Sequence, residues 1–353
     1  MSTSIPPLLP DEQLRLARED VRRSNRRRRW LWFFLALSLI FNVIFWGMIK
    51  VQRRPVDPRT QSIFTERFIS GDRDSKNKIA LIRVDGIISS SSESHVGYEG
   101  MVGDIKEQLR VALDDESVKA IILRVDSPGG EVLASDEIYR AVKEASQKGG
   151  DEGKLVICSM GSLAASGGFY AAMGADYIIA DELTITGSIG VIMQTLNYKD
   201  LFGKIGLKSI VFKSGKFKDI LNGGREPTQE EMDLVQKLIM ETYDKFVGIV
   251  AKERKLDENE LRNEIADGRI LSGKQALEAK LVDRTGNLDD AIEEAMNREN
   301  LEDARVVDYV VPFSLRNLFG FFAESRVQKI QLELPQTLDL QHGKLYFLSL
   351  HLF

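Results

Sequence analysis

The sequence predicts an α/β domain that follows one membrane-spanning helix. Three observations support this fold class: residues 30–49 form an apolar run without a charge, short β-branched runs alternate with helical patterns after Lys78, and two glycine-rich turns each follow a predicted strand. An apolar fraction of 43% over 353 residues is enough for a large core. The net charge of −5 provides no general basic surface, so we expect no nucleic-acid partner.

The first predicted element is the helix at residues 30–49. At a rise of ~1.5 Å per residue, a run of this length spans the ~30 Å hydrocarbon core of a bilayer. A buried core helix rarely lacks a charge over this length, and a cleaved signal peptide would usually have a shorter apolar region with a small-x-small site after Ile49. Residues 1–29 form a basic tail that contains RRSNRRRR. The positive-inside rule therefore predicts a cytoplasmic N-terminus and a globular part on the outer side of the membrane.

The rest of the chain divides into three segments. Residues 50–77 contain Pro and Arg without a sustained period, and we expect them to form a linker. Residues 78–311 are expected to form one large domain, followed by a C-terminal tail at 312–353 that docks on a neighbouring subunit or stays loose. The strand candidates of the domain are KIALIRV, KAIILRV, KLVICSM, YIIA and KSIVFK.

One long helix is predicted from Thr228 to about Arg254. Thr228 and Glu231 have the spacing of a capping box, which satisfies free N–H groups at a helix start. Apolar residues recur on one face of this helix from Met232 to Val250, and we interpret that face as packing.

The two glycine-rich turns carry the first signal of chemistry. In RVDSPGGEVLAS, Gly129 and Gly130 let the backbone turn sharply and expose an N–H group that can stabilise an oxyanion. In CSMGSLAASGGFYAA, Ser166 is expected at the start of a helix, where the N–H of Gly167 would face the oxygen of a carbonyl attacked by the serine. Sequences of Gly, Ser and Ala are also common in ordinary turns and caps, so Ser166 alone does not predict catalysis.

A serine nucleophile needs a base, and no histidine has a suitable context. The three histidines show neither an HExxH motif nor paired-ligand spacing, so no metal or cofactor is expected. The single cysteine, Cys158, lies in KLVICSM and is interpreted as a small buried apolar residue rather than a thiol nucleophile. A lysine can act as a base where burial favours its neutral form. The candidates that remain open at this point are Lys199, Lys213, Lys216 and Lys218.

Five motifs in order resemble the signal peptide peptidase A family, a family of membrane-anchored Ser/Lys peptidases. The resemblance covers about residues 78–310, in the single-unit form of the family, and implies a fold related to Clp protease and the crotonases. The motifs are DSPGG at 126–130, GSLAASGGFYAA at 161–172, TGSIGV at 186–191, KSGKFKDI at 213–220 and ADGRILSGKQALEAKLVDRTG at 266–286.

The resemblance assigns roles to residues by position. It implies that Ser166 is the nucleophile, Lys218 the general base, and that Gly130 and Gly167 are the oxyanion donors. Ser188 in TGSIG matches a serine that orients the lysine, with an ordinary turn residue as the alternative. Peptide substrates are implied, namely remnant signal peptides or other membrane-associated polypeptides. The alternative functions are a crotonase-like acyl-thioester enzyme and an inactive membrane scaffold.

The resemblance also implies an assembly at the membrane. The single-unit form is expected to build a ring-like or dome-like homo-oligomer, with an octamer as one form. In such a ring Lys218 of one subunit would serve Ser166 of the next.

Overall fold

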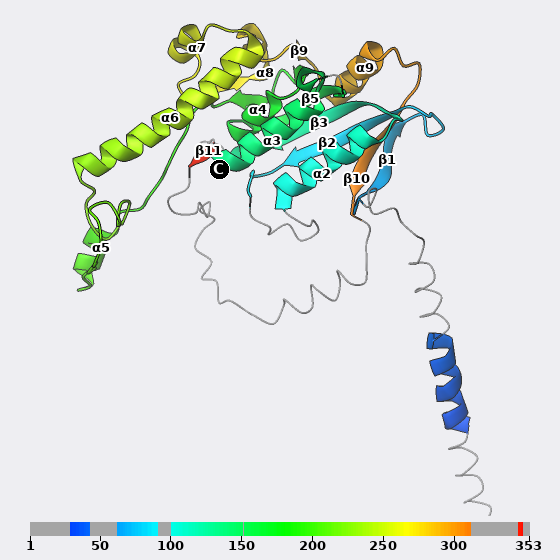
Figure 1. The fold of residues 1–353 in the computed structure, drawn as a ribbon, viewed down its shortest axis with the longest axis horizontal. Coiled ribbons are helices and arrows are strands. Elements are labelled where there is room, and N and C mark those ends of the chain that lie inside the picture. Colours follow the sequence, from blue (N-terminus) through cyan, green and yellow to red (C-terminus); the bar gives the residue numbers. More distant parts are fainter. Residues whose placement is uncertain (1–28, 43–61, 91–99, 151, 312–344, 349–353) are drawn as a thin grey trace, which may run out of the picture. The chain divides into compact units, whose positions relative to one another are not determined.

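The computed structural model describes residues 29–42, 62–90, 100–150, 152–311 and 345–348 (Figure 1). The chain divides into two compact units, Met1–Gln61 and Ser62–Phe353. In the first unit, residues 29–42 are helical and their side chains are exposed. No helix among the described residues has both the length and the apolar character to cross a membrane. Residues 43–49 of the predicted span lie outside the described residues.

The second unit is built on a mainly parallel sheet. Within its described residues, nine strands pair in the order β1-β10-β2-β3-β5-β6-β9, with β7 joined to β5 and β8 joined to β7. In this sheet only the β1–β10 and β7–β8 pairs are antiparallel. The strands are β1 (Thr65–Gly71), β2 (Lys78–Asp85), β3 (Val118–Ser127), β5 (Leu155–Ala165), β6 (Tyr177–Ala180), β7 (Ile185–Gly187), β8 (Ile270–Ser272), β9 (Arg284–Thr285) and β10 (Arg305–Val310).

Two short strands form a separate pair. β4 (Gly129–Glu131) follows β3 almost directly, and β11 (Tyr346–Leu348) comes from the C-terminal tail and pairs with it antiparallel. A segment near the C-terminus therefore lies beside one of the two predicted glycine-rich turns.

Helices cover both faces of the sheet, because alternate residues of the central strands point to opposite faces. On one face, Ile79, Ile122 and Ile157 pack with the helix α9. On the other face, Ile82, Leu123 and Cys158 share a larger apolar cluster with helices that Figure 1 shows in front of the sheet. The helices of the unit are α2 (Gly100–Asp114), α3 (Val132–Ala145), α4 (Gly167–Ala172), α5 (Lys199–Lys204), α6 (Gln229–Arg254), α7 (Glu258–Glu264), α8 (Gly273–Glu278) and α9 (Leu288–Arg298), with a 3₁₀ turn at Gln147–Gly149. This architecture confirms the predicted α/β class.

The sheet begins earlier than the boundary expected at residue 78. β1 lies inside the segment 50–77 that we expected to be a linker, and it pairs with β10 at the edge of the sheet. The guanidinium of Arg67 donates to both carboxylate oxygens of Asp308, at 3.0 and 2.6 Å. An edge strand that is largely exposed has no alternating apolar pattern, and this explains why its sequence gave no signal.

The long helix α6 confirms the prediction of a helix from Thr228 to about Arg254. Thr228 is its N-cap, and the capping box with Glu231 is complete. The apolar face packs only towards the C-terminal end, where Phe246 and Val250 are buried, whereas Met232 near the start is 45% exposed. The first half of α6 therefore projects beyond the sheet, towards α5 in Figure 1.

The prediction of a strand at KSIVFK is wrong. Residues 208–213 have no regular secondary structure, and Ile210 and Phe212 are 77% and 96% exposed. A β-branched run forms a strand only where another strand can pair with it, and none among the described residues does so here.

Candidate active site

Ser166 lies at the junction between β5 and α4, as the sequence predicts. It is the N-cap of α4 and has φ 51° and ψ −112°, a conformation that costs energy for a residue with a side chain. Its N–H donates to the carbonyl of Gly187 at 2.8 Å, and its carbonyl accepts from the N–H of Tyr170 at 2.8 Å. These two bonds hold the strained backbone in place.

The hydroxyl of Ser166 is buried without a partner. The residue is 1% exposed, and its Oγ has no hydrogen-bond partner among the described residues. Buried hydroxyls are normally paired, because leaving one unpaired costs about 1–3 kcal/mol. A strained backbone and a buried hydroxyl without a partner are the features expected of a serine nucleophile whose base comes from elsewhere.

The glycine turn at 129–130 lies directly against the start of α4. A Cβ on Gly129, which has φ +99°, would stand 2.6 Å from the backbone nitrogen of Gly167. A Cβ on Gly167 would stand 3.1 Å from the nitrogen of Gly130. The two backbone N–H groups therefore lie close together because the residues around them lack side chains. The structure brings Gly130 and Gly167 together, beside Ser166.

The direction of the Gly130 N–H follows from its neighbours in β4. The N–H of Glu131 donates to Ile88 at 2.8 Å, and Gly129 accepts from Ile88 at 2.8 Å. Successive N–H groups of an extended chain point to opposite sides, so the N–H of Gly130 faces away from Ile88. It therefore points to the other edge of β4, where β11 pairs in this structure.

Ser188 lies next to Ser166 on the neighbouring strand. β5 and β7 run parallel and pair Ala165 with Gly187, so the next residue of each strand is a serine. Both serines have positive φ, 51° and 52°. Ser188 is 7% exposed, and its N–H donates to the carbonyl of Arg269 at 2.8 Å. Its position is compatible with orienting a base and with an ordinary turn, so its role stays a prediction.

The four candidate lysines differ in their partners. Lys213 donates to Asp219 at 2.6 Å, Lys216 pairs with Glu230, and Lys199 lies 3.7 Å from Glu226. A carboxylate stabilises the charged ammonium form, which opposes a role as a base. The exposed ammonium of Lys218 has no such partner among the described residues.

Lys218 does not lie beside Ser166 in the described part of the chain. It belongs to a series of turns at 214–221 between α5 and the start of α6, and no hydrogen bond joins it to either serine. Figure 1 shows α5 and the start of α6 at the end of the long helix that is far from α4. One chain therefore brings together Ser166, Ser188, Gly130 and Gly167 but not the lysine.

A charged network beside Lys218 was missed by sequence reasoning. Arg225 donates twice to Asp219, the residue after Lys218, at 2.8 Å in each bond. It also donates to Glu231 at 2.8 Å, and this hydrogen bond helps to lower the pKa of Glu231 to about 2. Glu231 in turn caps α6 through the N–H of Thr228 at 2.8 Å. The network ties the lysine-bearing turns to the first turn of α6.

Cys158 has no part in this site. It is fully buried on β5, and burial raises the pKa of its thiol to about 12. A thiol in such surroundings stays protonated, which agrees with its interpretation as a small apolar residue.

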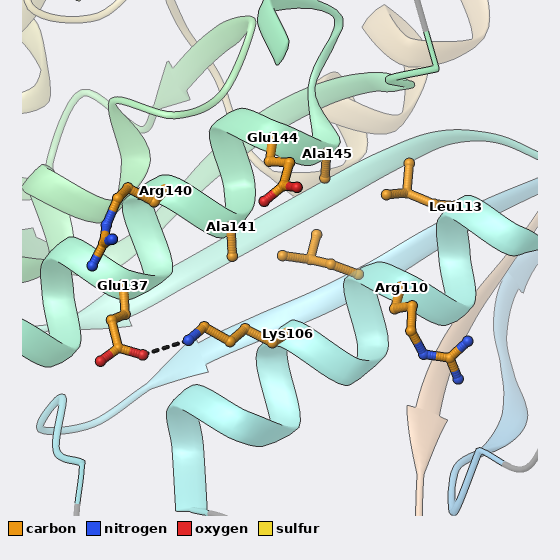
Figure 2. Close-up of a pocket in the computed structure, with 9 residues that line it drawn as sticks. Lys106, Arg110, Leu113, Glu137, Arg140, Ala141, Glu144 and Ala145 are labelled. Atoms are coloured by element: carbon orange, nitrogen blue, oxygen red, sulfur yellow. Dashed lines mark hydrogen bonds and ion pairs between the residues drawn. The ribbon is translucent and has the colours of Figure 1, made fainter. Parts of the chain in front are cut away.

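A surface hollow on the helical face also lies outside the site. It has a volume of about 620 Å³ and lies between α2 and α3 (Figure 2). Lys106 and Glu137 form an ion pair across it, and none of the predicted site residues lines it. The side chains that line it include no serine, threonine or cysteine that could act as a nucleophile.

Comparison with known proteins decides the family. The model of Peptidase family S49 matches residues 148–302. A protein named "Putative signal peptide peptidase SppA" from Enterococcus faecium is 33% identical over 298 residues, which cover 80% of this chain and 84% of that protein. The chain belongs to peptidase family S49. It is a serine peptidase, and the S49 match includes Ser166 and Lys218.

Two further relatives support the S49 assignment. "Putative protease slr0021" from Synechocystis is 41% identical over 65% of this chain and 78% of that protein. "Serine protease SPPA, chloroplastic" from Arabidopsis thaliana is 36% identical over 72% of this chain and 37% of its own length. Among solved structures, a point mutant of ClpP1 from Listeria monocytogenes matches 60% of this chain and 94% of its own, at 15% identity and a TM-score of 0.40. The predicted relation to the Clp and crotonase fold stays a prediction.

Proposed function

We propose that this S49 peptidase is a membrane-bound endopeptidase with a Ser166–Lys218 dyad. Its substrates are remnant signal peptides or other membrane-associated polypeptides, which it cleaves through an acyl-enzyme. The observation that carries the proposal is the unpaired, buried hydroxyl of Ser166 beside the convergent N–H groups of Gly130 and Gly167.

The mechanism uses the edge of β4 that pairs with β11 in this structure. An extended peptide takes the place of β11 on this edge as an antiparallel strand and places its scissile carbonyl over Ser166. Lys218 accepts the proton of the hydroxyl as the oxygen attacks the carbonyl carbon, while Gly130 and Gly167 donate to the oxyanion. The amine leaves with the proton from Lys218, and water then hydrolyses the ester.

The dyad is completed between subunits in this proposal. Lys218 and Ser166 lie apart in one chain, and the turns that carry Lys218 are flanked by exposed apolar residues such as Ile205, Phe212 and Met232. Exposed apolar residues of this kind are typical of surfaces that bind another protein. A ring-like or dome-like homo-oligomer would cover them and bring Lys218 of one subunit to Ser166 of the next.

The proposal places this assembly at the outer side of the membrane. The support is the charge-free run at 30–49 and the arginine-rich segment before it, which together predict a single span with a cytoplasmic N-terminus. A site in this location would meet membrane-bound peptides soon after they are released.

The test is labelling with a serine-directed fluorophosphonate, combined with cleavage of apolar peptides. We expect the wild-type chain to be labelled and active, and Ser166→Ala to be neither. Ser162→Ala is a matched control, because Ser162 lies four residues earlier, on β5, and is exposed. Labelling of the Ser166→Ala variant would show that another residue is the nucleophile.

Sharing of the dyad is tested by mixing two inactive variants. Ser166→Ala and Lys218→Ala chains are each expected to be inactive, and co-expression should restore part of the activity because some sites then contain both residues. A mixture that forms oligomers without regaining activity would contradict sharing between subunits.

A further inference from the structure

Two neighbouring residues of α3 contact the short helix that begins after Ser166. Figure 1 shows α3 and α4 side by side in front of the sheet. At the start of α4 the two helices touch, because a Cβ on Gly167 would overlap the hydroxyl of Ser135. Further along α4, the hydroxyl of Tyr170 donates to the carboxylate of Asp136 at 2.7 Å. The helix that follows the nucleophile is therefore held by α3 at two points.

Tyr170 connects this contact to the backbone of the nucleophile. Its N–H donates to the carbonyl of Ser166 at 2.8 Å, which is the first hydrogen bond of a helix whose N-cap is Ser166. The side chain is fully buried, and its ring centroid lies 5.5 Å from that of Tyr139 and 4.9 Å from that of Phe246. A bond that fixes the Tyr170 hydroxyl therefore also fixes the first turn of α4 and the strained backbone of Ser166.

Asp136 is a buried carboxylate with three partners. The residue is 6% exposed. Besides Tyr170, the ammonium of Lys245 on α6 lies 2.7 Å from one carboxylate oxygen, and a guanidinium nitrogen of Arg140 lies 3.1 Å from the other. Burial alone would raise the pKa of Asp136, but the hydrogen bonds from Lys245 and Tyr170 outweigh it and hold the pKa below its ordinary value. The bond from Tyr170 is therefore charge-assisted, which makes it stronger than a bond to a neutral acceptor.

Stability alone does not explain a charge at this position. Removing a carboxylate from water costs free energy, and an apolar side chain of similar volume often gives an equally stable protein. The side chains of Lys245 and Arg140 are 54% and 61% exposed, so water weakens their attraction to Asp136. A charged acceptor does, however, fix the direction of the hydroxyl that donates to it, because such bonds are short and directional.

We propose that Asp136 is a positioning residue for Ser166. It fixes α4 through the hydroxyl of Tyr170, so that the Oγ of Ser166 and the N–H of Gly167 keep the geometry needed for attack on a carbonyl. Asp136 acts only through Tyr170 and takes no proton in the reaction. The inference rests on the proposed role of Ser166 as the nucleophile, and it adds a residue of α3 to the support of the site.

The first test is a double-mutant cycle on kcat. Tyr170→Phe removes one hydroxyl and leaves Asp136 paired with Lys245 and Arg140, whereas Asp136→Ala removes the carboxylate. We expect each change to lower kcat by about 10- to 100-fold with little change in KM, because α4 shifts while the strand that binds the peptide does not. The double variant should be no slower than the slower single variant, because both changes break the same bond. Losses that multiply would overturn the proposal.

Tyr139→Phe is the matched control for Tyr170→Phe. The Tyr139 hydroxyl donates to the buried carboxylate of Glu253 at 2.9 Å, and its ring packs edge to face on that of Tyr170. The control therefore removes the same kind of bond from the same aromatic cluster, but from α3 instead of α4. We expect a similar fall in melting temperature with the kcat of wild type. Equal losses of kcat in the two variants would indicate a general effect of weaker packing and would overturn the proposal.

Asp136→Asn tests the contribution of the charge. An amide oxygen can still accept from the Tyr170 hydroxyl, but without the assistance of a charge, so kcat should lie between those of wild type and Asp136→Ala. Tyr170→Phe decides the question even if Asp136→Ala does not fold, because it keeps the buried ring and all other partners of Asp136. A Tyr170→Phe chain that is folded by circular dichroism and keeps the wild-type kcat would overturn the proposal.

Fluorophosphonate labelling separates this inference from the function on which it rests. The probe needs no peptide strand, so its rate of reaction reports the geometry of the serine and of the oxyanion donors. We expect the rate to fall together with kcat in Tyr170→Phe and to stay at the wild-type value in Tyr139→Phe. Wild-type protein that is labelled at Ser166 and cleaves peptides, with both rates unchanged in Tyr170→Phe, would retain the proposed function and reject the role of Asp136. Wild-type protein that takes no label and cleaves no peptide would reject both proposals.

Discussion

Arg225 holds Asp219 through two hydrogen bonds of 2.8 Å, and Asp219 directly follows the proposed base, Lys218. The same guanidinium reaches Glu231 in the first turn of α6. A planar guanidinium binds a carboxylate through two nitrogens. Arg225 therefore fixes both the distance and the angle between the turn that contains Asp219 and the first turn of α6. Arg225 is therefore a positioning residue for Lys218.

The first prediction concerns this positioning. Arg225→Gln should lower kcat by about 10- to 100-fold with little change in KM, because small displacements of a catalytic group cost rate rather than binding. Arg225→Lys should recover only a small part, since an ammonium cannot form the paired bonds. Arg269→Gln is the matched control, because it removes an exposed arginine that pairs with Asp267 two residues earlier. Equal loss in both variants would point to a general effect on stability.

The second prediction is a pH dependence of stability at Glu231. Its pKa is lowered from 4.5 to about 2, first of all by the hydrogen bond from Arg225. A lowered pKa in the folded state means that the stabilisation is fully present above about pH 4.5 and is lost as the pH falls through about 2. Glu231→Gln keeps a side chain that can cap the helix but loses the charge. We expect its melting temperature to lie below wild type at pH 7 and to converge with it near pH 2. A constant difference over this range would contradict the assignment.

The fold was largely predictable where strands are buried on both faces. Parallel central strands read as continuous β-branched runs, and four of the five predicted runs are strands β2, β3, β5 and β6. The fifth, KSIVFK, has the same composition but no strand to pair with among the described residues, which a local pattern cannot reveal. β1 was missed for the opposite reason, because an exposed edge strand needs no apolar alternation.

The site was predictable only where its geometry requires small residues. Gly129, Gly130 and Gly167 must lack side chains for their backbones to approach, so the local sequence signals them. The pairing of Ala165 with Gly187 and of β11 with β4 joins segments far apart in the chain. Such pairings depend on tertiary packing, and no local sequence pattern predicts them. Arg225 was missed because, in the sequence, it resembles an ordinary surface charge.

The third prediction concerns the identity of the base. A neutral amine must accept the serine proton, so kcat/KM should rise towards alkaline pH, and Lys218→Arg should be inactive because a guanidinium stays protonated. Lys216→Arg is the matched control, because Lys216 lies two residues earlier and already pairs with Glu230. A flat profile from about pH 5 to 9, under conditions where chemistry limits the rate, would exclude a lysine base.

The fourth prediction tests the oxyanion donors through the close approach of two backbones. In Gly167→Ala the new Cβ would overlap the hydroxyl of Ser135 and stand 3.1 Å from the nitrogen of Gly130, so the two N–H groups must move apart. Removal of one oxyanion donor typically costs about 100- to 1000-fold in kcat, and we expect a loss of this size with fluorophosphonate labelling slowed in parallel.

The control for this substitution is Gly248→Ala in α6. A Cβ at Gly248 meets nothing within 4 Å, and alanine in a helix interior is favoured over glycine by about 0.5–1 kcal/mol. This variant should therefore be slightly more stable than wild type and equally active. If Gly167→Ala kept a wild-type kcat while remaining folded by circular dichroism, the N–H groups of Gly130 and Gly167 would not be the oxyanion donors.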